Sequence, residues 1–146
     1  MTLPKIKFKI VTPERTVYEN EIDQATLPMT DGEVTILPNH TSYIASLKAG
    51  EIKLKKDKEE IALAVSGGFI EFDNNNLVIL ADTAERAEEI DEKRAEEARK
   101  KAEELKKQKI NMSEADFAKV VAAVDKEMAR IKVARKHRSK KGIKLN

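Results

Sequence analysis

The sequence predicts an α+β fold in which an N-terminal antiparallel β-sandwich is followed by a C-terminal antiparallel two-helix hairpin. Short strand-like runs separated by turn formers continue as far as Leu80, and beyond it the apolar period changes from two residues to about 3.6. The charge divides at the same place: residues 1–83 hold 9 Lys and Arg against 13 Asp and Glu, and residues 84–146 hold 19 against 13. We therefore expect a sandwich domain over 1–83 and a helical domain over 84–146.

The strand prediction is clearest near the N-terminus. In the segment KIKFKIV, the apolar residues Ile6, Phe8 and Ile10 fall on one face and lysines on the other, as in a half-buried strand. Similar short runs follow in the order RTVYE, QATL, EVTIL, EIKLK, EIALAVS, GFIEF and NLVIL. Turn formers such as Pro13 and the TDG and DNNN segments separate them. Many short strands with regular turns are typical of an antiparallel sandwich or barrel.

The first helix is predicted over ADTAERAEEIDEKRAEEARKKAEELKKQK, which contains neither Gly nor Pro. We expect it to begin at an Asp82 or Thr83 cap. Small apolar residues recur in it at intervals of three or four and form a narrow face suited to close packing on a partner. These residues are Ala95, Ala98, Ala102 and Leu105.

The second helix has a stronger start signal. Ser113 and Asp116 resemble a capping box, and Met112 with Phe117 fits a hydrophobic staple. Its apolar line is Phe117, Val121, Val124, Met128 and Ile131. Two helices that join near Asn111 with facing apolar lines form an antiparallel hairpin, and we expect the cationic tail after residue 138 to be loose.

Several function classes are disfavoured by composition and motifs. The chain has no cysteine, so disulfides and thiol catalysis are excluded, and no apolar run approaches the length of a membrane span or a signal-peptide core. The SGG at Ser66–Gly68 lacks the lysine of a phosphate loop and is interpreted as a turn between strands. Two histidines, His40 and His137, without paired spacing do not predict a metal site. Because no nucleophile or paired-carboxylate motif is present, we do not expect an enzyme.

Four segments in order resemble the ε subunit of the bacterial F-type ATP synthase. They are IVTPERTVYE, DGEVTILPNHTSYIASLKAG, IALAVSGGFIEF and ADTAERAEEIDEKRA, and the resemblance runs from about residue 5 to residue 136. It implies a non-catalytic rotor subunit of the central stalk that couples proton-driven rotation to ATP synthesis and restrains ATP hydrolysis through its hairpin. The implied partners are the γ subunit, the c-ring and the catalytic α and β subunits. The implied location is the cytoplasmic face of the cell membrane, with membrane contact only through the complex.

The resemblance also implies a possible regulatory ATP site, with no cofactor otherwise required. Its candidate residues are Glu85, Ile90, Asp91, Arg94, Ala95, Lys126 and Arg130, of which four match an I/L-D-x-x-R-A motif. Asp91 and Arg94 lie one turn apart and can address neighbouring polar groups of one ligand. Lys101 and Lys126 stand where ATP-binding relatives have arginine, so the bidentate hydrogen bonds that a planar guanidinium makes to phosphate are lost. The alternative is a pair between Asp91 and Arg94 within the helix, with Ala95 in the packing face.

Two further groups are candidates for subunit contact. By resemblance, Glu33 and His40 face the c-ring and γ, although a solvated turn carboxylate and a loop hydrogen bond are alternatives. The second group lies on the basic second helix, where from Phe117 onward ten Lys and Arg oppose two acidic residues. Its members are Arg130, Lys132, Arg135 and Lys136, which by resemblance meet an acidic loop of the catalytic β subunits. The alternative function is an adaptor or nucleic-acid-binding module that uses this helix, because cations that neutralise phosphates give sequence-independent affinity. No helix-turn-helix, zinc motif or aromatic platform supports that alternative, so we expect no nucleic acid partner.

Overall fold

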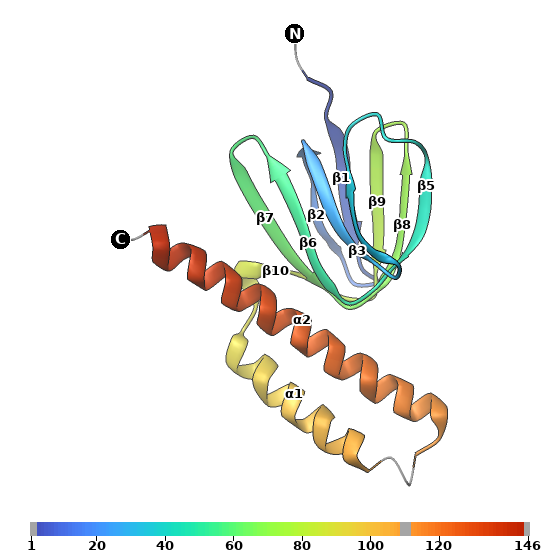
Figure 1. Ribbon diagram of the computed structural model, residues 1–146, viewed down its shortest axis with the longest axis vertical. Coiled ribbons are helices and arrows are strands. Elements are labelled where there is room, and N and C mark those ends of the chain that lie inside the picture. The colour runs from blue at the N-terminus through green and yellow to red at the C-terminus, as the bar shows by residue number, and fades with distance from the viewer. Residues whose placement is uncertain (1–2, 109–111, 145–146) are drawn as a thin grey trace.

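The structure, a computed structural model, describes residues 3–108 and 112–144 and places ten strands before two helices in that part of the chain (Figure 1). The strands are β1 (Ile6–Val11), β2 (Thr16–Ile22), β3 (Gln24–Met29), β4 (Gly32–Ile36), β5 (Tyr43–Leu47), β6 (Gly50–Lys56), β7 (Glu59–Val65), β8 (Gly68–Asp73), β9 (Asn76–Ala81) and β10 (Ala84–Arg86). The helical elements are the 3-10 turn η1 (Ala87–Glu89), α1 (Glu92–Lys107) and α2 (Glu114–Lys144).

The strands form one curled sheet whose two layers face each other as a sandwich. Its order is β10-β7-β6-β3-β5-β8-β9-β1-β2, with β4 paired to β3. All pairs are antiparallel except β1 with β9, which run parallel; β1 lies between β9 and β2. The predicted fold class is confirmed, with this one parallel pair inside the sandwich.

The core of the sandwich follows the predicted alternation. Ile6, Phe8 and Ile10 are buried while the lysines between them are exposed. Burying one side chain of this size stabilises the folded state by about 1.5–3 kcal/mol relative to leaving it exposed. Gly68, in the predicted turn between β7 and β8, has φ +139°, and a Cβ there would lie 2.0 Å from the carbonyl oxygen of Leu80. The turn interpretation of the SGG segment is confirmed, and its last glycine is required by the close approach of β9.

Two strands were not predicted from the sequence. In β5 the side chains of Tyr43, Ala45 and Leu47 face the core, but Ile44 between them is exposed, so the outer face is not polar throughout. In β10 the segment Ala84–Arg86 pairs with β7, although its composition favours a helix. The buried side chain of Ala84 packs with the sandwich core, and this tertiary contact overrides the local helix propensity.

The expected start of the first helix at Asp82 or Thr83 is wrong. The chain first forms β10 and η1, and α1 begins at Glu92 with Asp91 as its N-cap. The Asp91 side chain accepts a hydrogen bond from the backbone N–H of Arg94, which satisfies one of the free amides of the first turn. The division of the chain between residues 83 and 84 stays a prediction.

The helices pack as the predicted antiparallel hairpin at one end of the sandwich (Figure 1). In α1 the side chains of Ala95 and Ala102 are buried, whereas Leu105 is largely exposed. In α2 Val124 and Ile131 are buried, but the prediction for Met128 is wrong because 54% of it is exposed. Among the described residues, no helix combines the length and the apolarity needed to cross a membrane.

The prediction for the start of α2 is confirmed, and the prediction for its end is wrong. The hydroxyl of Ser113 accepts a hydrogen bond from the Asp116 backbone N–H, so the predicted cap is confirmed. The expected loose tail after residue 138 is wrong, since α2 continues to Lys144. An ion pair from Lys140 to Glu60 of β7 ties this last part of the helix to the sheet.

Candidate functional site

The interface between α2 and the sandwich contains a small apolar cluster. Val133 is fully buried against Ala64 of β7 and Ala87 of η1, with Ala62 and Ile90 packed beside them. The separate core of the sandwich is much larger and is built from Ile, Leu and Phe side chains. Because burial energy scales with apolar area, the hairpin is held to the sandwich far more weakly than the sandwich is held together.

Arg130 of α2 joins the hairpin to the last strand of the sheet. Its Nε donates to Glu85 of β10 at 2.7 Å, its Nη2 reaches the other Glu85 oxygen at 3.3 Å, and its Nη1 donates to Glu127 at 2.7 Å. The Arg130 side chain is 18% exposed. Burial opposes its charge, yet the hydrogen bonds to Glu85 and Glu127 outweigh burial and raise the pKa of Arg130. All three nitrogens of this guanidinium therefore bond to carboxylates of its own chain.

Two further ion pairs connect α2 to the sheet in the described part of the chain. Lys136 donates to Glu51 of β6 at 2.9 Å, and the Glu51 side chain is only 8% exposed. Lys140 donates to Glu60 of β7 at 2.5 Å, and this hydrogen bond lowers the pKa of Glu60. Together with Arg130, these lysines place three cations of α2 on acidic residues of the sandwich.

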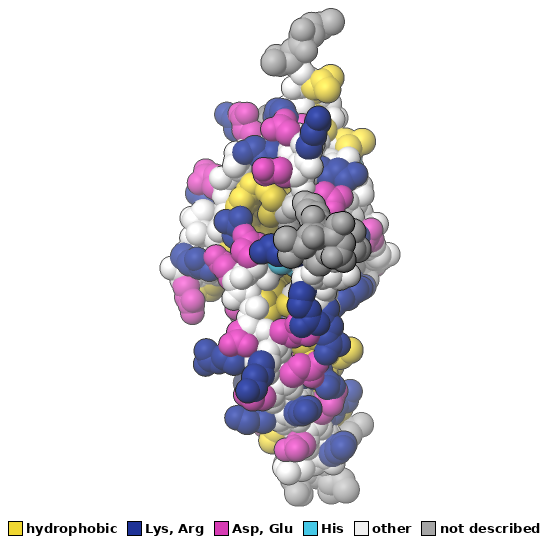
Figure 2. Space-filling view, turned by 90° about the vertical axis from the view of Figure 1, so that its left-hand side faces the viewer, with side chains coloured by type: hydrophobic (Ala, Val, Ile, Leu, Met, Phe, Trp, Pro, Cys, Tyr) yellow, Lys and Arg dark blue, Asp and Glu magenta, His cyan; other side chains and the backbone are white. Residues whose placement is uncertain are grey.

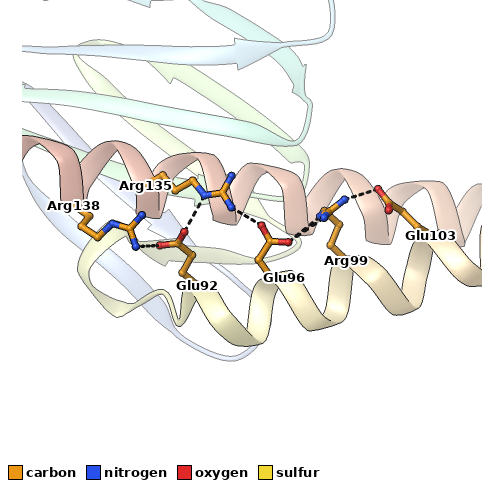
Figure 3. Close-up of polar contacts among 6 residues, drawn as sticks. All are labelled: Glu92, Glu96, Arg99, Glu103, Arg135 and Arg138. Atoms are coloured by element: carbon orange, nitrogen blue, oxygen red, sulfur yellow. Dashed lines mark hydrogen bonds and ion pairs between the residues drawn. The ribbon is translucent and has the colours of Figure 1, made fainter.

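A chain of alternating charges joins α1 to α2 (Figure 3). Arg135 of α2 donates to Glu92 at 2.9 Å and to Glu96 at 2.6 Å, which lie one turn apart on α1. Arg138 adds a second pair to Glu92 at 2.9 Å. The chain continues along α1, where Arg99 donates to Glu96 and, at 2.8 Å, to Glu103. The hydrogen bond from Arg99 lowers the pKa of Glu96. This arrangement fixes the two helices to each other by charge as well as by the alanine face.

The structure brings together only some of the candidate ATP-binding residues. Glu85 and Arg130 are in direct contact but satisfy each other. Asp91 contacts Arg94 through the backbone N–H of Arg94, so the alternative of a side-chain pair between them is replaced by a helix cap. Ile90 lies in the apolar cluster and Ala95 is buried in α1.

The remaining cations of that set are less enclosed. Arg94 and Lys101 are exposed, and Lys126 is half-buried on α2. In the described part of the chain, none of these three makes an ion pair within 4 Å. The ATP assignment for the whole set stays a prediction.

Glu33 and His40, both predicted to contact other subunits, lie apart: Glu33 is in β4 and His40 is in the loop that follows it. Glu33 is at the hairpin end and pairs weakly with Lys53 at 3.6 Å. His40 is in the loop after β4, where its Nδ1 lies 2.7 Å from the carbonyl oxygen of Thr41 and its ring lies edge-on to Phe72 at 5.8 Å. Both have local partners, and their roles in subunit contact stay predictions.

Five cations of α2 are paired with carboxylates in the described part of the chain. Of the four cations assigned to subunit contact, Arg130, Arg135 and Lys136 each bond to carboxylates, and Lys132 makes no ion pair within the described residues. Figure 2 shows Lys and Arg interspersed with Asp and Glu over this face of the hairpin. No sequence signal identified the acidic partners Glu51, Glu60 and Glu92, because they are distant in the chain and are brought near α2 only by folding.

An exposed apolar face on β5, β8 and β9 was also missed. Ile44, Phe69 and Leu80 are 75%, 61% and 56% exposed. Phe69 lies directly opposite Leu80, and Ser46, two residues after Ile44 on the same strand, lies opposite Phe69, so the three share one face. Grouped exposed apolar side chains mark interaction sites more often than scattered ones do.

Comparison with known proteins gives matches over most of the chain. A family model described as ATP synthase, delta/epsilon chain, beta-sandwich domain matches residues 5–87, and one described as the long alpha-helix domain of the same chain matches 88–135. A protein of Dehalococcoides mccartyi named ATP synthase epsilon chain is 45% identical over 136 residues, covering 93% of this chain and 96% of the relative. A protein of Desulforamulus reducens with the same name is 42% identical, covering 88% of this chain and 96% of the relative.

A solved structure shows the same fold at low identity. A chain in the mitochondrial ATP synthase of Euglena gracilis, in a structure of OSCP, F1 and the c-ring, aligns with a TM-score of 0.74 and 18% identity. The alignment covers 92% of this chain and 84% of that chain. At this identity the likeness supports the fold alone.

Proposed function

This chain belongs to the ATP synthase epsilon-chain family, and from that premise we propose that it is a non-catalytic subunit of the central stalk. In this role it turns with the rotor, couples proton-driven rotation to ATP synthesis, and restrains ATP hydrolysis through its hairpin. The observation that carries the proposal is the match of both domains, in order, to epsilon chains over almost their whole length. The complex places the chain at the cytoplasmic face of the membrane without direct insertion.

The sandwich is the part that binds γ. Its exposed apolar face of Ile44, Phe69 and Leu80 lies on β5, β8 and β9, whereas α2 packs mainly on β6 and β7, so the face is accessible while the hairpin is docked. The γ subunit is the occupant that fits a permanent apolar contact, because a rotor must transmit torque through a stable joint. In this proposal the c-ring contacts the sandwich near Glu33, away from the face that binds γ.

The hairpin is the regulatory part. Its apolar contact with the sandwich is small, and most of the remaining attachment is ionic. The 31 residues of α2 make a rod about 46 Å long at about 1.5 Å per residue, long enough to reach far into a catalytic head when released. The cations that hold α2 to the sandwich are then free to pair with acidic residues of the catalytic β subunits.

Regulatory ATP, in this proposal, acts on the same equilibrium. A ligand shifts a conformational equilibrium only through its difference in affinity between the two states. Asp91 and Arg94 are on α1 and Arg130 is on α2, so a site that uses all three exists only in the closed hairpin. At 100 times its dissociation constant, ATP would favour that state by about 2.7 kcal/mol. To enter, its phosphates must compete with Glu85 and Glu127 for Arg130.

The test is reconstitution with the catalytic α, β and γ subunits of the same organism. We expect the chain to co-purify with γ and to lower the rate of ATP hydrolysis by the assembled head. An adaptor or nucleic-acid-binding module would instead leave γ unbound and be retained on a phosphate-rich polymer at moderate salt.

A further inference from the structure

A groove of about 880 Å³ lies between α2 and one end of the sandwich, beside their contact. One wall comes from the end of β3, the start of β4 and the β5–β6 turn, the other from α2, and Arg99 of α1 closes one side. None of the seven candidate ATP-binding residues lines it. Its volume lies within the roughly 300–1,000 Å³ that is usual for small-molecule sites.

The groove has an excess of positive charge. Six Lys or Arg line it against three acidic residues, Glu33, Glu51 and Asp125. Lys53 pairs with Glu33 and Lys136 with Glu51, while Arg99 and Arg135 bond to glutamates of α1. This leaves two lysines, Lys48 in the β5–β6 turn and Lys132 on α2, without an ion pair in the described part of the chain.

The two unpaired lysines flank an apolar surface. Met128 lies one turn before Lys132 on α2 and lines the groove. Its side chain is 54% exposed, whereas a methionine packed between the helix and the sandwich would be covered. Pro28 lines the sandwich wall beside Lys48. A thioether and a proline ring offer a surface on which a flat apolar group packs well.

We infer that this groove binds a small phosphate-bearing molecule, with Lys48 and Lys132 holding its phosphates from opposite walls. Hydrogen bonds from ammonium groups to phosphate are charge-assisted and stronger than neutral ones. The site differs from the proposed ATP site because Lys132 and Arg130, two residues apart, are separated by about 200° around the helix. A ligand that bridges the sandwich and α2 stabilises the docked hairpin, because releasing the hairpin removes one wall.

The test is calorimetry on the full chain with sodium pyrophosphate at constant ionic strength. Lys48→Gln and Lys132→Gln each remove one charge at an exposed position, so folding is preserved. We expect each to weaken binding about tenfold or more, the effect of losing one hydrogen bond to a charged group. The matched controls are Lys119→Gln on another face of α2 and Lys58→Gln in the β6–β7 turn, both exposed and outside the groove, which should bind pyrophosphate as the unmodified chain does.

A second arm separates free phosphates from nucleotides. Met128→Ser should weaken binding of a nucleoside triphosphate in competition with pyrophosphate but leave pyrophosphate itself unaffected if the apolar surface holds a base. Equal affinity loss in all four lysine variants would show only general charge attraction, and absence of heat at millimolar pyrophosphate would show no site; either result overturns the inference. Neither result touches assembly with γ, on which the proposed function is tested.

Discussion

Arg130 of α2 and Glu85 of β10 are joined by two hydrogen bonds, and Glu127 takes a third bond from the same guanidinium. One side chain therefore links α2 to the last strand of the sandwich. Its removal would leave Glu85 and Glu127 close together without a cation between them. The state of the hairpin thus depends on a contact that is mostly ionic and largely shielded from water.

The first prediction concerns this contact. Arg130→Gln should destabilise the docked hairpin by about 1–3 kcal/mol, because two enclosed carboxylates lose their charged partner. Hydrogen exchange should become faster in α2 while the strands of the sandwich keep their protection. Lys126→Gln, one turn earlier and without an ion pair, is the control and should behave as the unmodified chain. Unchanged α2 exchange in Arg130→Gln would show that the Arg130 contact is not needed to hold the hairpin on the sandwich.

The second prediction separates two roles of Asp91. Asp91→Ala removes the N-cap of α1 and should cost about 1 kcal/mol in stability, whereas Asp91→Ser keeps a cap oxygen and should cost little. If Asp91 also contacts ATP, both variants lose binding heat in calorimetry, since serine lacks the carboxylate. ATP heat that is retained in the serine variant would assign Asp91 to capping alone.

The third prediction concerns pH. Hydrogen bonds from Lys140 and Arg99 lower the pKa values of Glu60 and Glu96 below their ordinary value of 4.5. Their contribution to the docked hairpin is therefore complete above about pH 4.5 and is lost as the pH falls through the lowered values. We expect the exchange protection factors of amides in α1 and α2 to fall as the pH drops below about 4.5. Glu60→Gln should flatten part of this dependence, and an unaltered profile in that variant would exclude Glu60 as a contributor.

The fourth prediction tests the exposed apolar face. Phe69→Ser and Ile44→Ser should weaken binding to γ at least tenfold, because they remove apolar area that is already solvent-exposed in the free chain. Thermal stability of the isolated chain should change little for the same reason. Leu3→Ser, at another exposed leucine, is the matched control for surface hydrophobicity. Full γ affinity in both face variants, measured by surface plasmon resonance, would place the γ contact elsewhere.

Local patterns predicted most of the fold. The strand of Ile6, Phe8 and Ile10 and the cap at Ser113 were correct because each depends on residues close in the chain. The start of α1 was predicted too early because pairing of β10 with β7 decides it, and β7 lies about 20 residues away. Met128 was assigned to the helix interface because period alone does not show which apolar face meets a partner.

The candidate site was predictable only in part. The contact between Glu85 and Arg130 joins two residues that the resemblance had grouped, although as partners of ATP and not of each other. The acidic partners of Lys136 and Lys140 lie about 80 residues away, and a charge count treats them as part of an unrelated domain. Long-range pairing is set by the packing of α2 on β6 and β7, which no local spacing encodes.

We propose that the cations of α2 pair with acidic residues of this chain when the hairpin is docked and with those of the catalytic subunits when it is released. The most direct measurement is the rate of ATP hydrolysis by the assembled catalytic head, at equal occupancy, with two opposed variants of this chain. Glu51→Gln with Glu85→Gln removes the charged partners of Lys136 and Arg130 on the sandwich, and we expect slower hydrolysis than with the unmodified chain. Reversing the charge of Arg130, Lys132, Arg135 and Lys136 should instead release hydrolysis. Equal rates with both variants and the unmodified chain would show that these cations do not control ATP hydrolysis.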